Sequence, residues 1–175
     1  MDRENIITSV DLVCQYAKRK ENENFRFRTY VKFRVSMNDD QLDAVVREAT
    51  DQVWSRIDCL SCANCCKTLQ PVLDLEDIER LAKRLGMSPK KFEQQYVARA
   101  PGGDRVIKRA PCPFLEGNAC SVYEDRPKAC KDYPYLHSEG FRQRMLYAIG
   151  NAASCPIVYN TMERLKRRVG FKKRG

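Results

Sequence analysis

Hydrophobic and polar residues alternate along residues 25–35, where the chain reads FRFRTYVKFRV. One side carries Phe25, Phe27, Thr29, Val31, Phe33 and Val35, and the other carries Arg26, Arg28, Tyr30, Lys32 and Arg34. A period of two predicts a short N-terminal strand with one basic face. A helix is the alternative, because Phe27 and Val31 are also spaced to share one face of a helix.

The pattern becomes helical after the turn-like segment SMNDD. In QLDAVVREATDQVWSRI the apolar positions recur every three or four residues, at Leu42, Val45, Val46, Ala49, Val53 and Ile57. Residues 38–40 offer polar side chains that can cap the first turn of a helix. We therefore predict a helix within residues 40–57.

Two shorter helices are predicted between residues 74 and 97. Asp74 can cap LEDIERLAKRLG, and Gly86 suits the end of that helix. The pair Ser88-Pro89 can begin the next helix, because proline is favoured at the first helical position. PGGDR at residues 101–105 reads as a loop, and NTMERLKRRVGF at residues 160–171 reads as a helix.

Cysteine and proline interrupt residues 110–160, which show few periodic apolar positions. Metal binding could supply the folding free energy that packing does not. The predicted fold is mainly α, a small single domain whose irregular Cys/Pro-rich segments surround a metal centre. Residues 1–57 would form an N-terminal strand and helix packed on the main domain, 58–160 the cysteine-cluster metal-binding domain, and 161–175 a basic tail.

Composition restricts the cellular context and the chemistry. The chain has no apolar run long enough to span a membrane, and its N-terminus lacks the apolar segment of a secretory signal, so we expect a cytoplasmic protein. Motifs for nucleotide binding or for a serine hydrolase are missing from the sequence. The formal net charge is +9, and the last fifteen residues hold seven Lys or Arg against one Glu. This tail is either a solvated helix end or a contact for nucleic acid or an acidic protein.

The nine cysteines carry the clearest chemical signal. Cys59, Cys62 and Cys65 have the C-x2-C-x2-C spacing of four-iron ferredoxin clusters, in which a remote ligand is followed by proline. Both Cys112-Pro113 and Cys155-Pro156 fit that remote position. Each C-x2-C pair is equally a zinc half-site, so two closed four-cysteine zinc sites are the alternative. Disulfide stapling and a thioredoxin-like redox site fit the compartment and the pattern less well.

Other residues near the cysteines have weaker signals. The adjacent pair Cys65 and Cys66 could serve two metals or bridge a multinuclear centre, since neighbouring side chains of an extended stretch point to opposite sides. Cys14 reads as a small buried hydrophobe and His137 as a solvated loop residue. Arg126, Tyr123 and Tyr133 could donate hydrogen bonds to cluster sulfurs, although Arg126 can equally have a purely structural role.

The order of these blocks, C-x2-C-x2-C-C, CPFL, CSVYEDRPKAC with a following YP, and a final CP, resembles the CxxCxxCC cysteine-cluster family (YkgJ-like proteins) over about residues 55–160. That family is described as zinc- or iron-chelating. The resemblance implies eight ligands, namely Cys59, Cys62, Cys65, Cys66, Cys112, Cys120, Cys130 and Cys155. The block is also similar to that of flagellin lysine N-methylases, which are longer and are linked to an iron–sulfur cluster.

Three functions follow as hypotheses. The first is an iron–sulfur protein, with a 4Fe–4S cluster and a redox or oxidoreductase-like role together with a redox or other protein partner. The second is a structural zinc protein whose basic tail binds nucleic acid or protein. The third is a lysine methylase-like enzyme, which rests on the resemblance alone.

Overall fold

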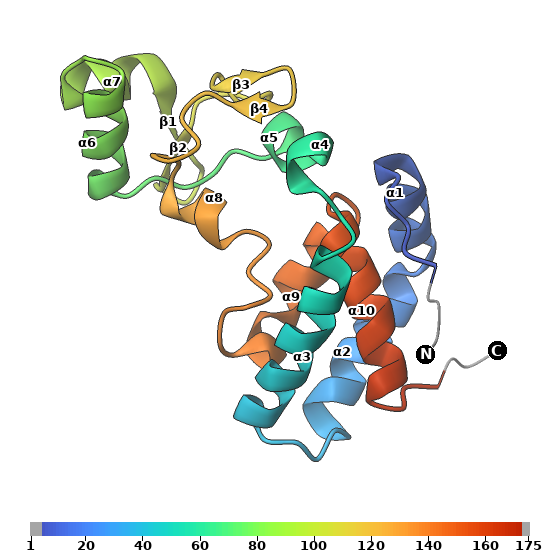
Figure 1. Cartoon of the computed structure of the whole chain (residues 1–175). Coiled ribbons are helices and arrows are strands. Elements are labelled where there is room, and N and C mark those ends of the chain that lie inside the picture. The colour runs from blue at the N-terminus through green and yellow to red at the C-terminus, as the bar shows by residue number, and fades with distance from the viewer. Residues whose placement is uncertain (1–4, 173–175) are drawn as a thin grey trace. The chain divides into compact units, whose positions relative to one another are not determined.

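The computed structural model describes residues 5–172, and it leaves residues 1–4 and 173–175 undescribed. Lys173 and Arg174 of the predicted basic tail therefore lie outside the described residues. The chain is mainly helical, as predicted, and carries two short antiparallel sheets (Figure 1). It divides into two compact units: unit 1 comprises residues 1–58 and 134–175, and unit 2 comprises Cys59–Tyr133.

Unit 1 is a bundle of helices. Its members are α1 (Val10–Arg19), α2 (Glu21–Phe33), α3 (Asp39–Trp54), α9 (Phe141–Asn151) and α10 (Pro156–Arg168). Helix α3 packs on α10 and α9, α2 packs on α9, and α1 packs on α10 and α2. The fully buried side chains of this core include Phe27, Leu42, Phe141, Met145, Ile157, Met162 and Leu165.

The predicted N-terminal strand is wrong, because residues 25–33 belong to helix α2. Phe27 and Val31, four residues apart, are fully buried, whereas Phe25 and Phe33 are 44% and 77% exposed. The alternation of aromatic and basic residues satisfied a period of two, but burial follows the helical period. Packing of one helical face against α9 therefore decided between the two structures.

The long helix predicted within residues 40–57 is confirmed as α3. The Asn38 side chain accepts a hydrogen bond from the Gln41 backbone amide, and the Gln41 side chain accepts one from the Asn38 backbone amide. This reciprocal capping box satisfies donors that the first helical turn leaves unpaired. Leu42, Val46 and Val53 are buried along one face, as the periodicity required.

Helix α9 was not predicted. We expected few periodic apolar positions in residues 110–160, and for the segment that forms α9 this expectation is wrong. Phe141, Met145 and Ala148 are buried at helical spacing. Just before α9, the buried carboxylate of Asp43 accepts hydrogen bonds from the backbone amides of Gly140 and Phe141. An acid on α3 thus caps a helix about a hundred residues further along the chain. The local sequence around α9 gives no sign of this contact.

The C-terminal helix α10 confirms the prediction for its segment and buries a charge. Lys166 is 3% exposed and forms ion pairs with Glu23 at 2.7 Å and Glu163 at 2.6 Å. Lys20 of unit 1 pairs with the same Glu163. Part of the positive charge predicted for a solvated tail is therefore neutralised inside the bundle.

Unit 2 combines short helices with two hairpins. Its elements are α4 (Cys59–Cys62), α5 (Asn64–Thr68), α6 (Leu75–Arg84), α7 (Pro89–Tyr96), β1 (Val97–Arg99), β2 (Arg105–Ile107), β3 (Leu115–Glu116), β4 (Ala119–Cys120) and α8 (Lys128–Asp132). Strands β1 and β2 pair with Ala98 opposite Val106, and the predicted loop at residues 101–105 closes this hairpin. Asp74 and Ser88 cap the N-termini of α6 and α7, as predicted, and Pro89 is the first residue of α7.

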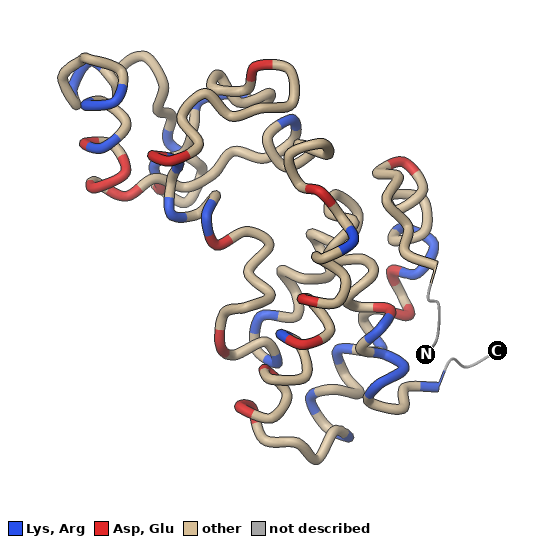
Figure 2. The backbone as a smooth tube through the Cα atoms, viewed as in Figure 1, with Lys and Arg blue, Asp and Glu red and all other residues tan. Residues whose placement is uncertain are grey.

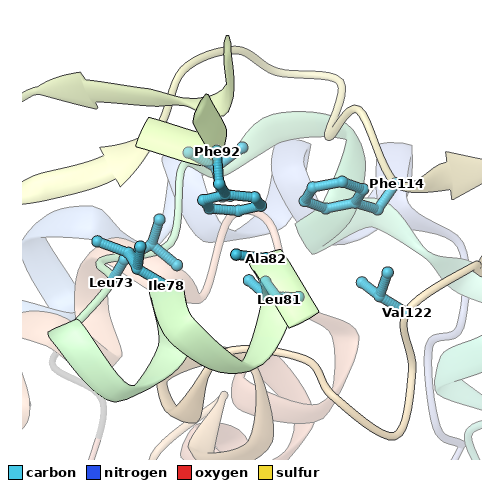
Figure 3. Close-up of a cluster of buried hydrophobic side chains, with 8 residues drawn as sticks. Leu73, Ile78, Leu81, Ala82, Phe92, Phe114 and Val122 are labelled. Atoms are coloured by element: carbon cyan, nitrogen blue, oxygen red, sulfur yellow. The ribbon is translucent and has the colours of Figure 1, made fainter. Parts of the chain in front are cut away.

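The core of unit 2 lies between α6, α7 and the loops that carry cysteines (Figure 3). Phe92 and Phe114 lie with their ring centroids 6.2 Å apart, above the α6 residues Leu81 and Ala82. The core also contains Leu73, Ile78, Ile107 and Val122. No helix within residues 5–172 is both long enough and apolar enough to cross a membrane.

Candidate metal centre

The segment CLSCANCC forms two very short helices, α4 and α5, separated by Ala63. Ala63 has a left-handed backbone with φ of 46°, which an L-residue with a side chain adopts only at a cost in free energy. Its side chain is buried, so the surrounding structure fixes this bend. The bend separates Cys59 and Cys62 on α4 from Cys65 and Cys66 on α5.

The neighbouring thiols of Cys65 and Cys66 lie close together, with their Sγ atoms 4.0 Å apart. The sequence-based expectation assumed an extended backbone that would send them to opposite sides, and the helical turn of α5 replaces it. In a tetrahedral site with metal–sulfur distances of about 2.3 Å, two sulfurs stand about 3.8 Å apart. The observed separation is close to that value, so Cys65 and Cys66 can ligate the same ion or two adjacent metal centres.

Cys112 and Cys120 come from the loop and hairpin that follow the α6–β2 segment. The Cys112 backbone amide donates a 2.8 Å hydrogen bond to the Cys66 carbonyl oxygen, which holds this loop beside α5. Cys120 ends strand β4 and pairs in register with Leu115 of β3. Both cysteine side chains pack against the hydrophobic core of unit 2.

Cys130 lies on α8, and a buried carboxylate positions that helix. Asp77 of α6 is 2% exposed and accepts a 3.0 Å hydrogen bond from the Lys128 backbone amide at the start of α8. Arg80, paired with Asp77, also donates to the carbonyl oxygens of Asp125 and Arg126. Sequence reasoning missed both residues; the only available signal was the D-x-x-D spacing of Asp74 and Asp77, which reads as a helix cap.

The thiols of unit 2 influence one another electrostatically. Burial raises the pKa of Cys130 to about 12, with further contributions from Cys66, Cys112 and Cys120. Burial is also the main cause of the raised pKa of Cys112 and of Cys120, and Cys66 adds to both. The charge of Cys66 thus disfavours ionisation of Cys112, Cys120 and Cys130, and the Asp77 carboxylate has the same effect on Cys130.

Cys66 behaves differently from the other three. A hydrogen bond with Cys65 lowers the pKa of Cys66 to about 7, and the Lys67 ammonium acts in the same direction, against the effect of burial. Its thiolate, the form that ligates metals, is thus accessible near neutral pH.

Two of the remaining cysteines belong to unit 1. Cys155 is 7% exposed and caps the N-terminus of α10, where its carbonyl oxygen accepts a hydrogen bond from the Tyr159 backbone. Cys14 lies half-buried on α1. His137, also in unit 1, contacts Asp51 at 2.7 Å and its ring lies 5.5 Å from that of Trp54.

Arg126 lies beside the thiols but its own contacts are structural. Its guanidinium stacks 3.8 Å from the centroid of the Tyr123 ring and donates to the Tyr123 carbonyl oxygen at 2.6 Å. Burial and the charge of Cys66 raise the pKa of Cys120, and the Arg126 charge offsets only part of this increase. Tyr133 is half-buried and ends α8. The proposed hydrogen bonds of Arg126, Tyr123 and Tyr133 to a cluster stay predictions.

The donor set fits a soft metal, although it is not closed around one. Within residues 5–172, no three His, Cys, Asp or Glu side chains are arranged to hold a metal ion as they stand. Thiols are nevertheless the donors that zinc, iron or Cu(I) prefers over hard cations, and unit 2 contains seven of the nine cysteines. The eight predicted ligands thus stay a prediction; among them, a backbone hydrogen bond joins Cys112 to Cys66, and Cys112 and Cys120 pack on the same core.

A small helical protein with such a set of thiols belongs to the class of cysteine-rich metal-binding proteins. The sequence places it more specifically: a family model with the description "CxxCxxCC: Putative zinc- or iron-chelating domain" matches residues 58–155, more than half of the 175 residues. The chain belongs to this family, as its motifs predicted. Comparison with curated proteins and with solved structures gave no match.

Proposed function

We propose that the protein binds one zinc or iron ion through Cys66, Cys112, Cys120 and Cys130, and that this ion stabilises unit 2. The 2.8 Å hydrogen bond from the Cys112 amide to the Cys66 carbonyl oxygen carries the proposal. Two further facts support it: Cys112 and Cys120 pack on the same core, and Asp77 of that core's helix α6 positions the start of α8, which carries Cys130. Thiolate-only ligation with four donors is typical of structural zinc sites and suits mononuclear iron as well.

The electrostatics of the site favour a bound cation. Burial and mutual repulsion keep the thiols of Cys112, Cys120 and Cys130 protonated in the metal-free protein. A divalent cation compensates several thiolates at once, so its binding would release protons to the solvent. Closing the site needs a rearrangement of the cysteine side chains, because no three of the described side chains are arranged to hold an ion as they stand.

The stabilising role follows from where the four cysteines lie. Cys112 and Cys120 pack against a core that contains only a few large side chains, and α8 is a single short turn. A bound ion would join α5, the β3–β4 hairpin and α8 at the edge of this core. Structural metal sites contribute folding free energy in small domains of this kind.

For Cys59, Cys62 and Cys65 we propose an iron–sulfur cluster, because they supply three of the four cysteine ligands that a 4Fe–4S centre takes. Their spacing, and the bend at Ala63 that follows Cys62, support a loop wrapped around a multinuclear centre. Such a cluster would add a redox role to the structural one. A second zinc ion at these cysteines is the alternative.

Metal analysis of protein purified without oxygen tests both parts. We expect zinc or iron in the wild type, and about one ion per chain less in a Cys112→Ser/Cys130→Ser variant. A brown protein with labile sulfide that becomes colourless in Cys62→Ser supports the cluster, whereas a colourless protein with about two zinc ions supports the alternative. Metal content that is unchanged in the double variant contradicts the four-thiol site.

A further inference from the structure

A basic groove lies in unit 1, built from α2 and the turn after α10. It has a volume of about 520 Å³ and is lined by the cations Arg26, Arg34 and Lys172 and by the aromatic rings of Tyr30, Phe33 and Phe171. The α2 residues Arg26, Tyr30, Phe33 and Arg34 share one helical face, since they are spaced by three or four positions. This face belongs to unit 1, whereas the four cysteines proposed to bind an ion belong to unit 2.

The floor of the groove is fixed by the chain reversal after α10. Gly170 has φ of +70°, and the Phe171 amide donates a 2.8 Å hydrogen bond to the Lys166 carbonyl oxygen. Phe171 then packs edge-on against Phe27 and Tyr30, with centroid distances of 5.2 and 5.4 Å. The Tyr30 hydroxyl donates to the Val169 carbonyl oxygen at 2.9 Å. The groove is therefore supported by the buried core, as a preformed site is.

The cations of this groove differ from others in the same unit. Lys166 and Arg168 form ion pairs with Glu23, Glu163 or Glu48. Arg26, Arg34 and Lys172 form no ion pair with any carboxylate of the described residues. No acid occurs between residues 24 and 38, and Figure 2 shows Lys and Arg along α2 and the C-terminal part of α10. The groove thus keeps an uncompensated positive charge.

Phe33 gives the groove a second recognition element. Its side chain is 77% exposed, although burial of a phenylalanine is favourable by about 1.5–3 kcal/mol. Together with Tyr30 and Phe171 it places aromatic surface between positive charges. Grooves of unpaired cations with an exposed aromatic ring are how proteins bind single-stranded nucleic acids, whose phosphates and unstacked bases need both elements.

We propose that this groove binds single-stranded nucleic acid, with phosphates at Arg26, Arg34 and Lys172 and a base stacked on Phe33. A duplex fits less well, because its bases are already stacked and cannot cover the Phe33 ring. An acidic peptide would satisfy the three cations but would leave the ring unused. Lys173 and Arg174, which follow in the sequence, add further positive charge to the same end of the chain.

The test uses the full-length, metal-loaded protein and a fluorescently labelled single strand of about 12 nucleotides, as RNA or DNA, in an anisotropy titration. We expect binding that weakens with salt, and an affinity about tenfold lower in Phe33→Ala because stacking on one base is lost. Arg26→Gln and Arg34→Gln should each reduce the slope of log K against log salt by about 0.7.

Matched controls are available in the same unit. Tyr147→Ala removes an aromatic ring that is 73% exposed on α9, and Arg19→Gln removes an exposed cation on α1. Both should keep the wild-type affinity. Equal losses in test and control variants, a preference for duplex, no binding at low salt, or equal affinity for a poly-glutamate peptide would each overturn the proposal. Circular dichroism confirms that every variant keeps its helical content.

Discussion

The backbone amide of Cys112 donates a 2.8 Å hydrogen bond to the carbonyl oxygen of Cys66. This bond joins the cysteine-rich α5 to a loop far along the chain, and it brings together two cysteines that spacing alone does not pair. Cys120 lies on strand β4 and Cys130 on helix α8 of the same unit. The proposal therefore assigns Cys66, Cys112, Cys120 and Cys130 to one ion and Cys59, Cys62 and Cys65 to a second centre, and it leaves Cys155 of unit 1 unassigned.

Replacing Cys130 with serine should remove the ion from the four-thiol group. Serine keeps the size of the side chain but offers a hard oxygen in place of a thiolate, so zinc or iron binding weakens strongly. We expect the metal content to fall by about one ion per chain and unit 2 to unfold at a lower temperature. Elemental analysis and thermal unfolding with and without added zinc measure both effects.

Cys14→Ser is the matched control for this experiment. Cys14 is half-buried on α1 of unit 1 and matches no part of the ligand pattern. Its replacement should leave the metal content unchanged. A loss of metal equal to that of Cys130→Ser would mean that serine substitution disturbs folding rather than ligation.

Replacing Asp77 with asparagine should weaken metal binding without removing a ligand. Asp77 accepts the Lys128 amide and pairs with Arg80, so it fixes the start of the helix that carries Cys130. Loss of the buried charge releases Arg80 and loosens α8, and outer contacts of this kind typically change metal affinity by about 10–100-fold. Competition with a chromophoric zinc chelator measures the affinity.

Asp132→Asn provides the comparison, because Asp132 pairs only with the exposed side chain of Lys128 on the same helix. Its effect on zinc affinity should be negligible, since exposed ion pairs contribute little. If Asp77→Asn binds zinc as tightly as Asp132→Asn does, α8 does not depend on the buried carboxylate.

The local sequence was sufficient to predict a helix wherever a capping residue precedes a helical period of apolar residues, as Asn38 does for α3 and Asp74 for α6. It was insufficient wherever a contact between distant positions fixes where a helix begins. Asp77 meets Lys128 across 51 positions, and Asp43 meets Gly140 across 97. The spacing of the cysteines was sufficient to predict the family, whereas their roles as ligands stay a prediction, and any grouping depends on how α5, the β3–β4 hairpin and α8 pack together.

Two phenylalanines of α2 test whether residues 25–33 form a helix or the strand that their alternating pattern predicted. In a strand, Phe25 and Phe27 would share one face and contribute alike; in the helix only Phe27 is buried. We expect Phe27→Ala to lower the free energy of unfolding by about 3–5 kcal/mol, because it leaves a cavity beside Phe171. Phe25→Ala should cost less than about 1 kcal/mol.

Urea unfolding followed by the fluorescence of Trp54, the single tryptophan, reports on unit 1 for both variants. Similar losses in Phe25→Ala and Phe27→Ala would favour the strand. Because both positions carry the same side chain, they differ only in burial, and the comparison needs no further control.

Glu163 should make the stability of unit 1 depend on pH. Burial raises the pKa of this carboxyl, but the charges and hydrogen bonds of Lys166 and Lys20 outweigh it and hold the pKa below the ordinary value of 4.5. In acid the native state therefore binds fewer protons than the unfolded chain. The contribution of Glu163 to the free energy of unfolding is present above pH 4.5 and is lost as the pH falls below that value.

Glu163→Gln removes this contribution. At pH 7 we expect this substitution to lower the free energy of unfolding by about 2–3 kcal/mol. The loss is smaller than that for a buried ion pair in which one charge is left without any partner, because Lys166 keeps its ion pair with Glu23. The difference in the free energy of unfolding between variant and wild type should narrow as the pH falls below 4.5, where the wild type loses the same interaction.

Glu21→Gln, at an exposed acid in the first turn of α2, should leave the free energy of unfolding at pH 7 unchanged. A difference for Glu163→Gln that stays constant between pH 7 and pH 3 would mean that the effect comes from packing, because only the charge of Glu163 can produce the narrowing.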